Sequence, residues 1–248
     1  MARYSCPKIS QIDDIQDSNL LRALRAEERE ALSRALERCN FESGDVLAEA
    51  GDDVSHVYFP CGPSLVSFVV LLDCGRTVET IMVGREGAVG GIVSQGRLPA
   101  YARAVVQFGG PFLRIETTAL EAAKDRSPRL RHFFTRYADC LLAQVFQSVA
   151  CKAGHTIEQR AAKWLIAAME RTGENVVPLT QERLAGMLGV GRSYVSRVIR
   201  QLRRENVLDT RRGALVVRDR EALKAKSCCC NEAVRRHFDT VLAGVYPH

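Results

Sequence analysis

Nine arginines lie close together in the C-terminal part of the chain, and their chemistry is the easiest to name. Segment 192–220 holds these nine arginines and only three acidic residues, so its net charge of +6 equals that of the whole 248-residue chain. Solvated charged faces usually mix both signs, whereas this one is almost purely basic. Arginine makes paired hydrogen bonds to phosphate and to guanine. The segment therefore indicates nucleic-acid binding, with a plain basic surface as the alternative.

A helix-turn-helix pattern covers residues 181–200. Its apolar positions suit the small core between two crossing helices, and the small Ala185 allows the close crossing. Gly189 falls where the tight turn needs a positive φ. Thr180 is suited to N-cap the first helix. The pattern alone is a weak signal, but a β-hairpin predicted at 207–217 and the arginine excess adjoin it. Together they predict a winged helix.

The second helix of this unit, about residues 192–205, is expected to enter a DNA major groove with its N-terminal end. Arg197 is the expected base reader, because arginine grips guanine O6 and N7 together. Arg200 lies further along, where it suits phosphates. The predicted DNA-binding residues are Thr180, Gln181, Arg192, Ser193, Tyr194, Ser196, Arg197, Arg200, Arg211 and Arg212. A helical hairpin with no role in DNA binding is the alternative.

The elements that must position this unit follow from periodicity. Residues 1–17 are expected to be a flexible arm, and residues 18–39 show helical spacing of leucines. Between residues 41 and 115, short β-rich runs alternate with turns at about ten-residue spacing, which predicts an antiparallel sandwich or barrel. The predicted strands are 54–59, 65–72, 77–83, 102–108 and 112–115, and a short helix is expected at 119–124.

A long helix is predicted from Ser127-Pro128 to about Ala153, because serine caps a helix well and proline suits its first turn. Its apolar residues lie on more than one side. One stripe is expected to pack on its own β-domain and the other on the same helix of a second subunit. The predicted dimer interface is Phe134, Tyr137, Leu141, Val145 and Ser148. A core helix of a monomer is the alternative. Gly154 interrupts the pattern, and a Thr156–Gln159 capping box begins the next helix.

These features together resemble the Crp/Fnr superfamily of bacterial transcription regulators over about residues 18–220. The resemblance rests on the Gly44-Asp45 and Gly51-Asp52 turns, the long helix and the segment 191–197. It implies an α+β fold: an N-terminal antiparallel β-roll of the cyclic-nucleotide-binding, jelly-roll kind, a long dimerisation helix and a C-terminal winged helix-turn-helix. The expected divisions are an arm at 1–17, a β-roll at 18–126, the helix at 127–153, the DNA-binding domain at 154–220 and a helical tail at 221–248. In that family, the positions of Arg192, Ser193 and Arg197 contact the operator, and that of Thr180 contacts the DNA backbone.

The sensor loop departs from the cyclic-nucleotide branch of the family. Gly91 stands where a glutamate is expected to hold the ribose, and the slot of the phosphate-binding pair falls near Leu98-Pro99. Val145-Phe146 replaces the polar pair that meets the adenine. A buried phosphate without a cation is costly, so cyclic AMP is not the expected effector. Another, unidentified small molecule is the alternative, with Arg85, Gly90, Arg97 and Arg103 as its candidate contacts.

The nine cysteines are expected to be reduced, since the chain shows no secretion signal. Only Cys6 precedes Cys39, so the N-terminal iron–sulfur cluster of another branch is not expected. Two members of the Cys228-Cys229-Cys230 triplet with His237 form a possible zinc site, and one of them a possible redox sensor. Reduced thiols beside a terminal helix are the preferred interpretation. No metal and no cofactor are therefore predicted.

No catalytic motif such as a P-loop or a His-Glu-x-x-His zinc site occurs, so an enzyme is not expected. The prediction is a homodimeric regulator that binds a palindromic operator and is controlled by an unidentified signal at the β-roll. The expected partners are double-stranded DNA, a second copy of the chain and RNA polymerase. Without an apolar span or signal-peptide core, no membrane contact and a cytoplasmic location are expected. The alternatives are a thiol-, redox- or metal-responsive regulator and a ligand-binding or scaffold module that does not bind DNA.

Overall fold

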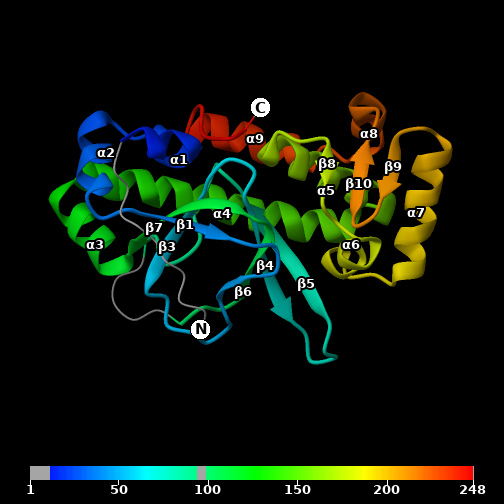
Figure 1. Cartoon of the computed structure of the whole chain (residues 1–248), viewed down its shortest axis with the longest axis horizontal. Helices are drawn as coiled ribbons and strands as arrows, with labels where there is room; N and C mark the ends of the chain where they lie inside the picture. The colour runs from blue at the N-terminus through cyan, green and yellow to red at the C-terminus, as the bar shows by residue number, and fades with distance from the viewer. Residues whose placement is uncertain (1–11, 94–98, 248) are drawn as a thin grey trace.

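Two antiparallel sheets form a β-roll in the computed structural model, which describes residues 12–93 and 99–247 (Figure 1). The first sheet has the order β1-β7-β3, made by Glu37–Phe41, Gly110–Glu116 and His56–Pro60. The second has the order β2-β6-β4-β5, made by Val46–Ala48, Arg103–Phe108, Leu65–Leu71 and Thr77–Val83. All neighbouring strands in the two sheets are antiparallel, which confirms the predicted architecture.

The N-terminal segment differs from the prediction in two places. Residues 1–11 of the predicted arm lie outside the described residues, but Ile12–Asp17 form a 3-10 helix, η1, whose Ile15 is buried. The single helix expected over 18–39 is instead α1 (Asn19–Arg22) and α2 (Ala26–Ser33). The extended backbone at Arg25, with φ −69° and ψ 158°, separates them. Residues 37–39 belong to β1, because they pair with β7.

Helix α4 (Pro128–Gly154) runs along the molecule from α3 (Thr117–Arg126) to the C-terminal domain (Figure 1). The Ser127 hydroxyl caps it by accepting the Leu130 N–H at 3.1 Å, as the sequence predicted. The C-terminal helix α9 (Cys230–Val241) packs beside α4. No helix in the described ranges is long and apolar enough to cross a bilayer.

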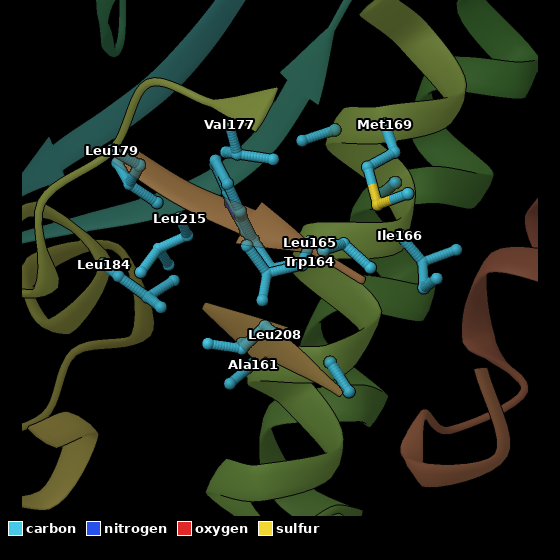
Figure 2. Close-up of a cluster of buried hydrophobic side chains, with 14 of the residues drawn as sticks. Ala161, Trp164, Leu165, Ile166, Met169, Val177, Leu179, Leu184, Leu208 and Leu215 are labelled. Carbon is cyan, nitrogen blue, oxygen red and sulfur yellow. The ribbon is translucent and has the colours of Figure 1, made fainter. Parts of the chain in front are cut away.

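The C-terminal domain is a winged helix-turn-helix. Its elements are α5 (Ile157–Thr172), β8 (Val176–Val177), α6 (Gln181–Leu188), α7 (Arg192–Arg204), β9 (Leu208–Arg211), β10 (Ala214–Val217) and α8 (Arg220–Lys226). Thr156 and Gln159 form the predicted capping box of α5. Figure 2 shows the core of this domain, where Trp164 and Leu165 of α5 meet Leu184 of α6 and Leu208 and Leu215 of the wing. This core positions α6 and α7 against the sheet.

The winged-helix domain packs directly on the β-roll. Arg183 of α6 donates to Ser43 Oγ at 2.9 Å and to Gln107 Oε1 at 2.8 Å. The indole N–H of Trp164 donates to Glu79 Oε1 of β5 at 2.8 Å. A fully buried ion pair joins Arg171 Nε of α5 to Glu86 Oε1 at 2.7 Å. Apolar residues of the roll also extend the core of the winged helix. The two parts therefore form one packed unit.

Candidate nucleic-acid interface

The turn between α6 and α7 is built on Gly189, as predicted. Its φ of 70° and ψ of 32° lie in the left-handed region, where an ordinary residue costs roughly 1–2 kcal/mol. The Gly189 N–H donates to the carbonyls of Ala185 and Gly186. The Val190 N–H donates to the Ala185 carbonyl at 3.0 Å. These bonds end α6 and direct the chain into α7.

Helix α7 has two unlike faces. Its apolar residues are buried in the domain core, and they are Val195, Val198, Ile199 and Leu202. Most of its predicted DNA contacts are exposed, and they are Arg192, Ser193, Tyr194, Arg197 and Arg200. The N-cap Gly191 has no side chain to bond the first N–H groups, and such free N–H groups attract phosphate at a helix N-terminus. The helix therefore presents a basic edge with an anion-attracting end.

The exposed arginines of α7 and the wing divide into paired and unpaired groups. Within the described part of the chain, six form no ion pair, and they are Arg192, Arg197, Arg200, Arg204, Arg211 and Arg212. Arg203 and Arg218 instead share Asp209, at 3.7 and 3.3 Å. The Thr210 N–H and the Arg218 guanidinium hold the pKa of Asp209 below its ordinary value. The positive charge available to a partner therefore gathers on α7 and the wing.

Arg197, the expected base reader, lies over the ring of Tyr194, with 5.2 Å between its guanidinium carbon and the ring centroid. Tyr194 is itself 42% exposed. A cation held over an aromatic face has fewer orientations to lose when it binds. The contact therefore positions Arg197 at the surface of α7.

The wing and the N-terminus of α6 flank this helix. Strands β9 and β10 form the hairpin predicted at 207–217, with Arg211 paired to Ala214 and with Arg212 and Gly213 in the turn. Thr180 caps α6 by accepting the Arg183 N–H at 3.2 Å. The Ser196 hydroxyl donates to Gln181 Oε1 at 2.8 Å. This last bond ties α7 to α6, so Ser196 and Gln181 position the hairpin as well as facing its surface.

The candidate effector residues have structural partners in different parts of the β-roll. Arg85 Nη2 lies 3.5 Å from the Glu170 carbonyl of α5, at the domain contact. Arg103 on β6 pairs with Glu49 at 3.1 Å. Gly90 has a φ of 124°, and a Cβ there would lie 2.4 Å from the His56 carbonyl, so packing requires this glycine. Arg97 lies outside the described residues. Arg85, Gly90 and Arg103 therefore lie at different places in the described part of the chain, and their role as effector contacts stays a prediction.

The residues predicted for the dimer interface mostly face their own chain. Phe134 is fully buried, and the Tyr137 hydroxyl bonds the backbone N–H and carbonyl of Ala88 at 2.9 and 3.2 Å. Ser148 donates to the Thr80 carbonyl at 2.6 Å. Leu141 and Val145 are partly buried against the β-roll core. Phe134 and Tyr137 are therefore wrong as dimer contacts, because their own chain buries them. Leu141, Val145 and Ser148 are only partly buried and stay a prediction.

A different stripe of α4 is left open. Leu142, Phe146 and Val149 are 50, 65 and 64% exposed. Their spacing of four and then three residues is that of a coiled-coil seam. The sequence showed that α4 is apolar on more than one side, but choosing the open stripe required knowing which side packs on the β-roll.

The cysteines also differ from the prediction. Cys39 forms a disulfide bond, so the prediction that every cysteine is reduced is wrong at this position. Cys228 and Cys230 lie beside Cys151 and His155, while His237 is exposed on α9. Burial raises the pKa of Cys228 and raises that of Cys230 to about 12. The Cys-x-x-x-His spacing at 151–155 was the signal that sequence reasoning missed.

Comparison with known proteins supports the assignment of the winged helix. Residues 159–226 match the family model described as the Crp-like helix-turn-helix domain. A search of curated proteins finds no significant match.

Several solved structures share the fold of this chain well beyond residues 159–226. FixK2 from Bradyrhizobium japonicum is 16% identical, with a TM-score of 0.65 over 78% of this chain and 98% of its own. TTHB099, a CRP-family regulator from Thermus thermophilus, is 20% identical, with a TM-score of 0.64 over 76% and 95%. The c-di-GMP-responsive regulator CLP from Xanthomonas campestris is 16% identical, with a TM-score of 0.63 over 78% and 99%. At these identities the likeness is one of fold.

Proposed function

Since residues 159–226 form a Crp-like helix-turn-helix domain on a chain with the fold of Crp/Fnr regulators, we propose that the protein is a homodimeric transcription regulator that binds a two-fold symmetric DNA site. The observation that carries the proposal is the exposed edge of α7. Arg192, Arg197 and Arg200 lie there without acidic partners in the described ranges, on a helix whose other face is buried. This is the arrangement that a recognition helix needs.

The open stripe of α4 supports the homodimer. Two copies of Leu142, Phe146 and Val149 would cover each other across a two-fold axis. The same axis would relate the two copies of α7, so the half-sites would lie roughly 34 Å apart, one turn of DNA. RNA polymerase is the further partner that we propose.

The proposed signal is one other than cyclic AMP. The resemblance to the cyclic-nucleotide branch places Val145 and Phe146 where the purine base meets polar side chains, and Gly91 where a carboxylate holds the ribose; in this chain these residues are apolar and without a carboxylate. Operator affinity measured with and without cyclic AMP is expected to be the same. A gain in affinity with cyclic AMP would contradict this part of the proposal.

Selection from a random pool of duplexes tests the DNA-binding function. The full chain is expected to enrich a palindromic sequence and to lose affinity steeply as salt rises, because bound arginines displace counterions. Fluorescence anisotropy on the selected duplex then compares single variants. Arg197→Ala is expected to cost about 1–3 kcal/mol and to relax base choice at one position. Arg212→Ala is expected to weaken all sequences alike and to reduce the salt slope by about 1.

Arg34→Ala is the matched control, because Arg34, the C-cap residue of α2, has a side chain that is 80% exposed and lies far in sequence from the winged helix. It is expected to leave the affinity unchanged. Enrichment of no sequence would overturn the proposal and favour a module that does not bind DNA. An equal loss of affinity in Arg34→Ala and Arg197→Ala would reduce the interaction to general charge attraction.

A further inference from the structure

Four side chains that bind soft metal ions meet where α4 ends. Cys151 lies in the last turn of α4, and His155 is its C-cap residue. Cys228 follows α8, and Cys230 begins α9. The candidate ligand atoms of the four residues all lie within 4.8 Å of one another. Residues far apart in the sequence therefore form one compact cluster.

The spacing within this cluster suits a single tetrahedral ion. Zinc bonds of about 2.3 Å to sulfur and about 2.0–2.1 Å to nitrogen place two sulfurs about 3.8 Å apart and a sulfur and a nitrogen about 3.5 Å apart. The Cys151 and Cys228 sulfurs are 3.7 Å apart, and Cys230 Sγ lies 3.6 Å from His155 Nδ1. The two sulfurs are also too far apart for a disulfide bond of about 2.05 Å. These two distances thus match the edges of a tetrahedral site, and all the candidate ligand atoms lie within 4.8 Å of one another.

A polar side chain contacts one of the clustered sulfurs. The side-chain amide of Gln147 donates to Cys230 Sγ at 3.1 Å. Such donors orient metal ligands and offset the charge on sulfur. The three cysteines are buried and form a cluster of their own, apart from the larger cores. Cys151 and Cys230 also line a cavity between α4, α5 and β5, which offers an entry path.

We propose that Cys151, His155, Cys228 and Cys230 bind one Zn²⁺ ion in a closed, four-coordinate site. Three thiolates and one imidazole are a set of ligands that zinc takes in structural sites. Binding displaces the thiol protons to solvent and involves no change of oxidation state. A cluster of several irons spreads its protein ligands farther apart than one ion does, so the short distances favour a mononuclear site. Cys229 is exposed and lies outside the set of four.

The ion would join the parts of the chain that meet at this joint. Cys151 and His155 belong to α4, while Cys228 and Cys230 connect α8 to α9. The next residue, Asn231, donates to the Lys163 carbonyl of α5 at 3.0 Å. The site therefore fixes the end of α4 against the winged-helix domain. This step rests on the proposed function: metal occupancy would control where α7 lies and, through its position, the affinity for the operator.

Metal analysis of the full chain, purified without chelator under reducing conditions, tests the site. Elemental mass spectrometry is expected to find one zinc ion per chain. Replacing the zinc with Co²⁺ is expected to give thiolate charge-transfer bands and the intense visible bands of tetrahedral cobalt, which added Zn²⁺ removes. Cys230→Ser and His155→Asn are expected to lose the metal. Cys229→Ser and His237→Asn, which change exposed neighbours of the same residue types, are expected to keep it.

The cobalt spectrum of the unsubstituted chain keeps the test decisive even if Cys230→Ser fails to fold. Absence of both zinc and the cobalt bands would overturn the proposal, as would metal loss in Cys229→Ser equal to that in Cys230→Ser. Iron with acid-labile sulfide would overturn the mononuclear site. A Cys151–Cys228 disulfide mapped in metal-free protein would also overturn it.

Operator affinity, measured on the same preparations, separates this inference from the proposed function. Metal-free protein is expected to bind the operator about 5- to 150-fold more weakly, the usual range of coupling between sites. Unchanged affinity would overturn the coupling. A loaded metal site in a chain that binds no DNA would overturn the proposed function alone.

Discussion

Phe146→Glu is expected to separate the proposed dimer into monomers. Phenylalanine has a side-chain surface on the order of 200 Å², and 65% exposure leaves about 130 Å² of it open in the single chain. Burial at about 25 cal/mol per Å² stabilises by about 3 kcal/mol. A two-fold interface uses the residue twice, so the dimer loses about 6 kcal/mol, which weakens its Kd on the order of 10⁴-fold. The buried carboxylates add to this loss.

Sedimentation velocity over a series of protein concentrations measures the effect. The unsubstituted chain is expected to sediment as a dimer at concentrations where Phe146→Glu sediments as a monomer. Tyr101→Glu is the control, because Tyr101 is an aromatic residue that is 89% exposed outside α4. Circular dichroism checks that all three proteins are folded.

A dimer that survives Phe146→Glu would refute the seam at Leu142, Phe146 and Val149. A monomeric unsubstituted chain would refute the dimer altogether. If Tyr101→Glu dissociated the dimer while Phe146→Glu did not, the contact between subunits would lie on the β-roll and not on α4.

Two further predictions concern the turn and the domain contact. Gly189→Ala is expected to destabilise the chain by about 1–2 kcal/mol, because φ at this position is 70°. Gly186→Ala in α6, where an added Cβ meets nothing within 4 Å, is expected to stabilise it by about 0.5–1 kcal/mol; equal thermal unfolding shifts would contradict the assignment of the turn. Burial raises the pKa of Glu79 above its ordinary 4.5, although Ser67 and Trp164 donate to it and Lys152 and Lys163 lie near. The Glu79 carboxyl thus binds its proton more tightly when the domains are packed than when they are apart. The domain contact is therefore expected to weaken as pH rises from 4.5 through the raised pKa of Glu79. The fluorescence of Trp164, the one tryptophan of the chain, reports the change, and Glu79→Gln is expected to remove it; a persistent pH response in Glu79→Gln would exclude Glu79 as the cause.

Local chemistry made several elements predictable from the sequence. Ser127-Pro128 marks the start of α4, because a hydroxyl cap and a proline act within one turn of chain. Gly189 marks the turn of the hairpin because glycine adopts this left-handed backbone conformation without strain. Such signals depend on residues within a few positions of one another, so they survive without knowledge of the fold.

Features that depend on distant contacts were not predictable in this way. The leucines of residues 18–36 suit a continuous helix, but Cys39 pairs with Phe112 of β7, and this pairing makes the segment around it a strand. Phe134 and Tyr137 were wrongly assigned to the dimer interface for a similar reason, since the position of the β-roll decides which side of α4 is covered. The metal ligands Cys151 and Cys228 are separated by 77 positions, so only the fold brings their sulfurs together.

The packing of the domains bears on how a signal would act. The basic edge of α7 is exposed while α6 and α5 are held on the β-roll by Arg183 and Arg171. Because α7 is already exposed in this packing, a signal would not need to uncover the recognition helix in order to change operator affinity. In a dimer joined along α4, the separation of the two copies of α7 depends on the angle at which α5 leaves α4. That angle is set at His155, where the backbone departs from the helix with φ −119° and ψ 149°. A signal that changes operator affinity would act most directly at this joint, where the four proposed zinc ligands meet.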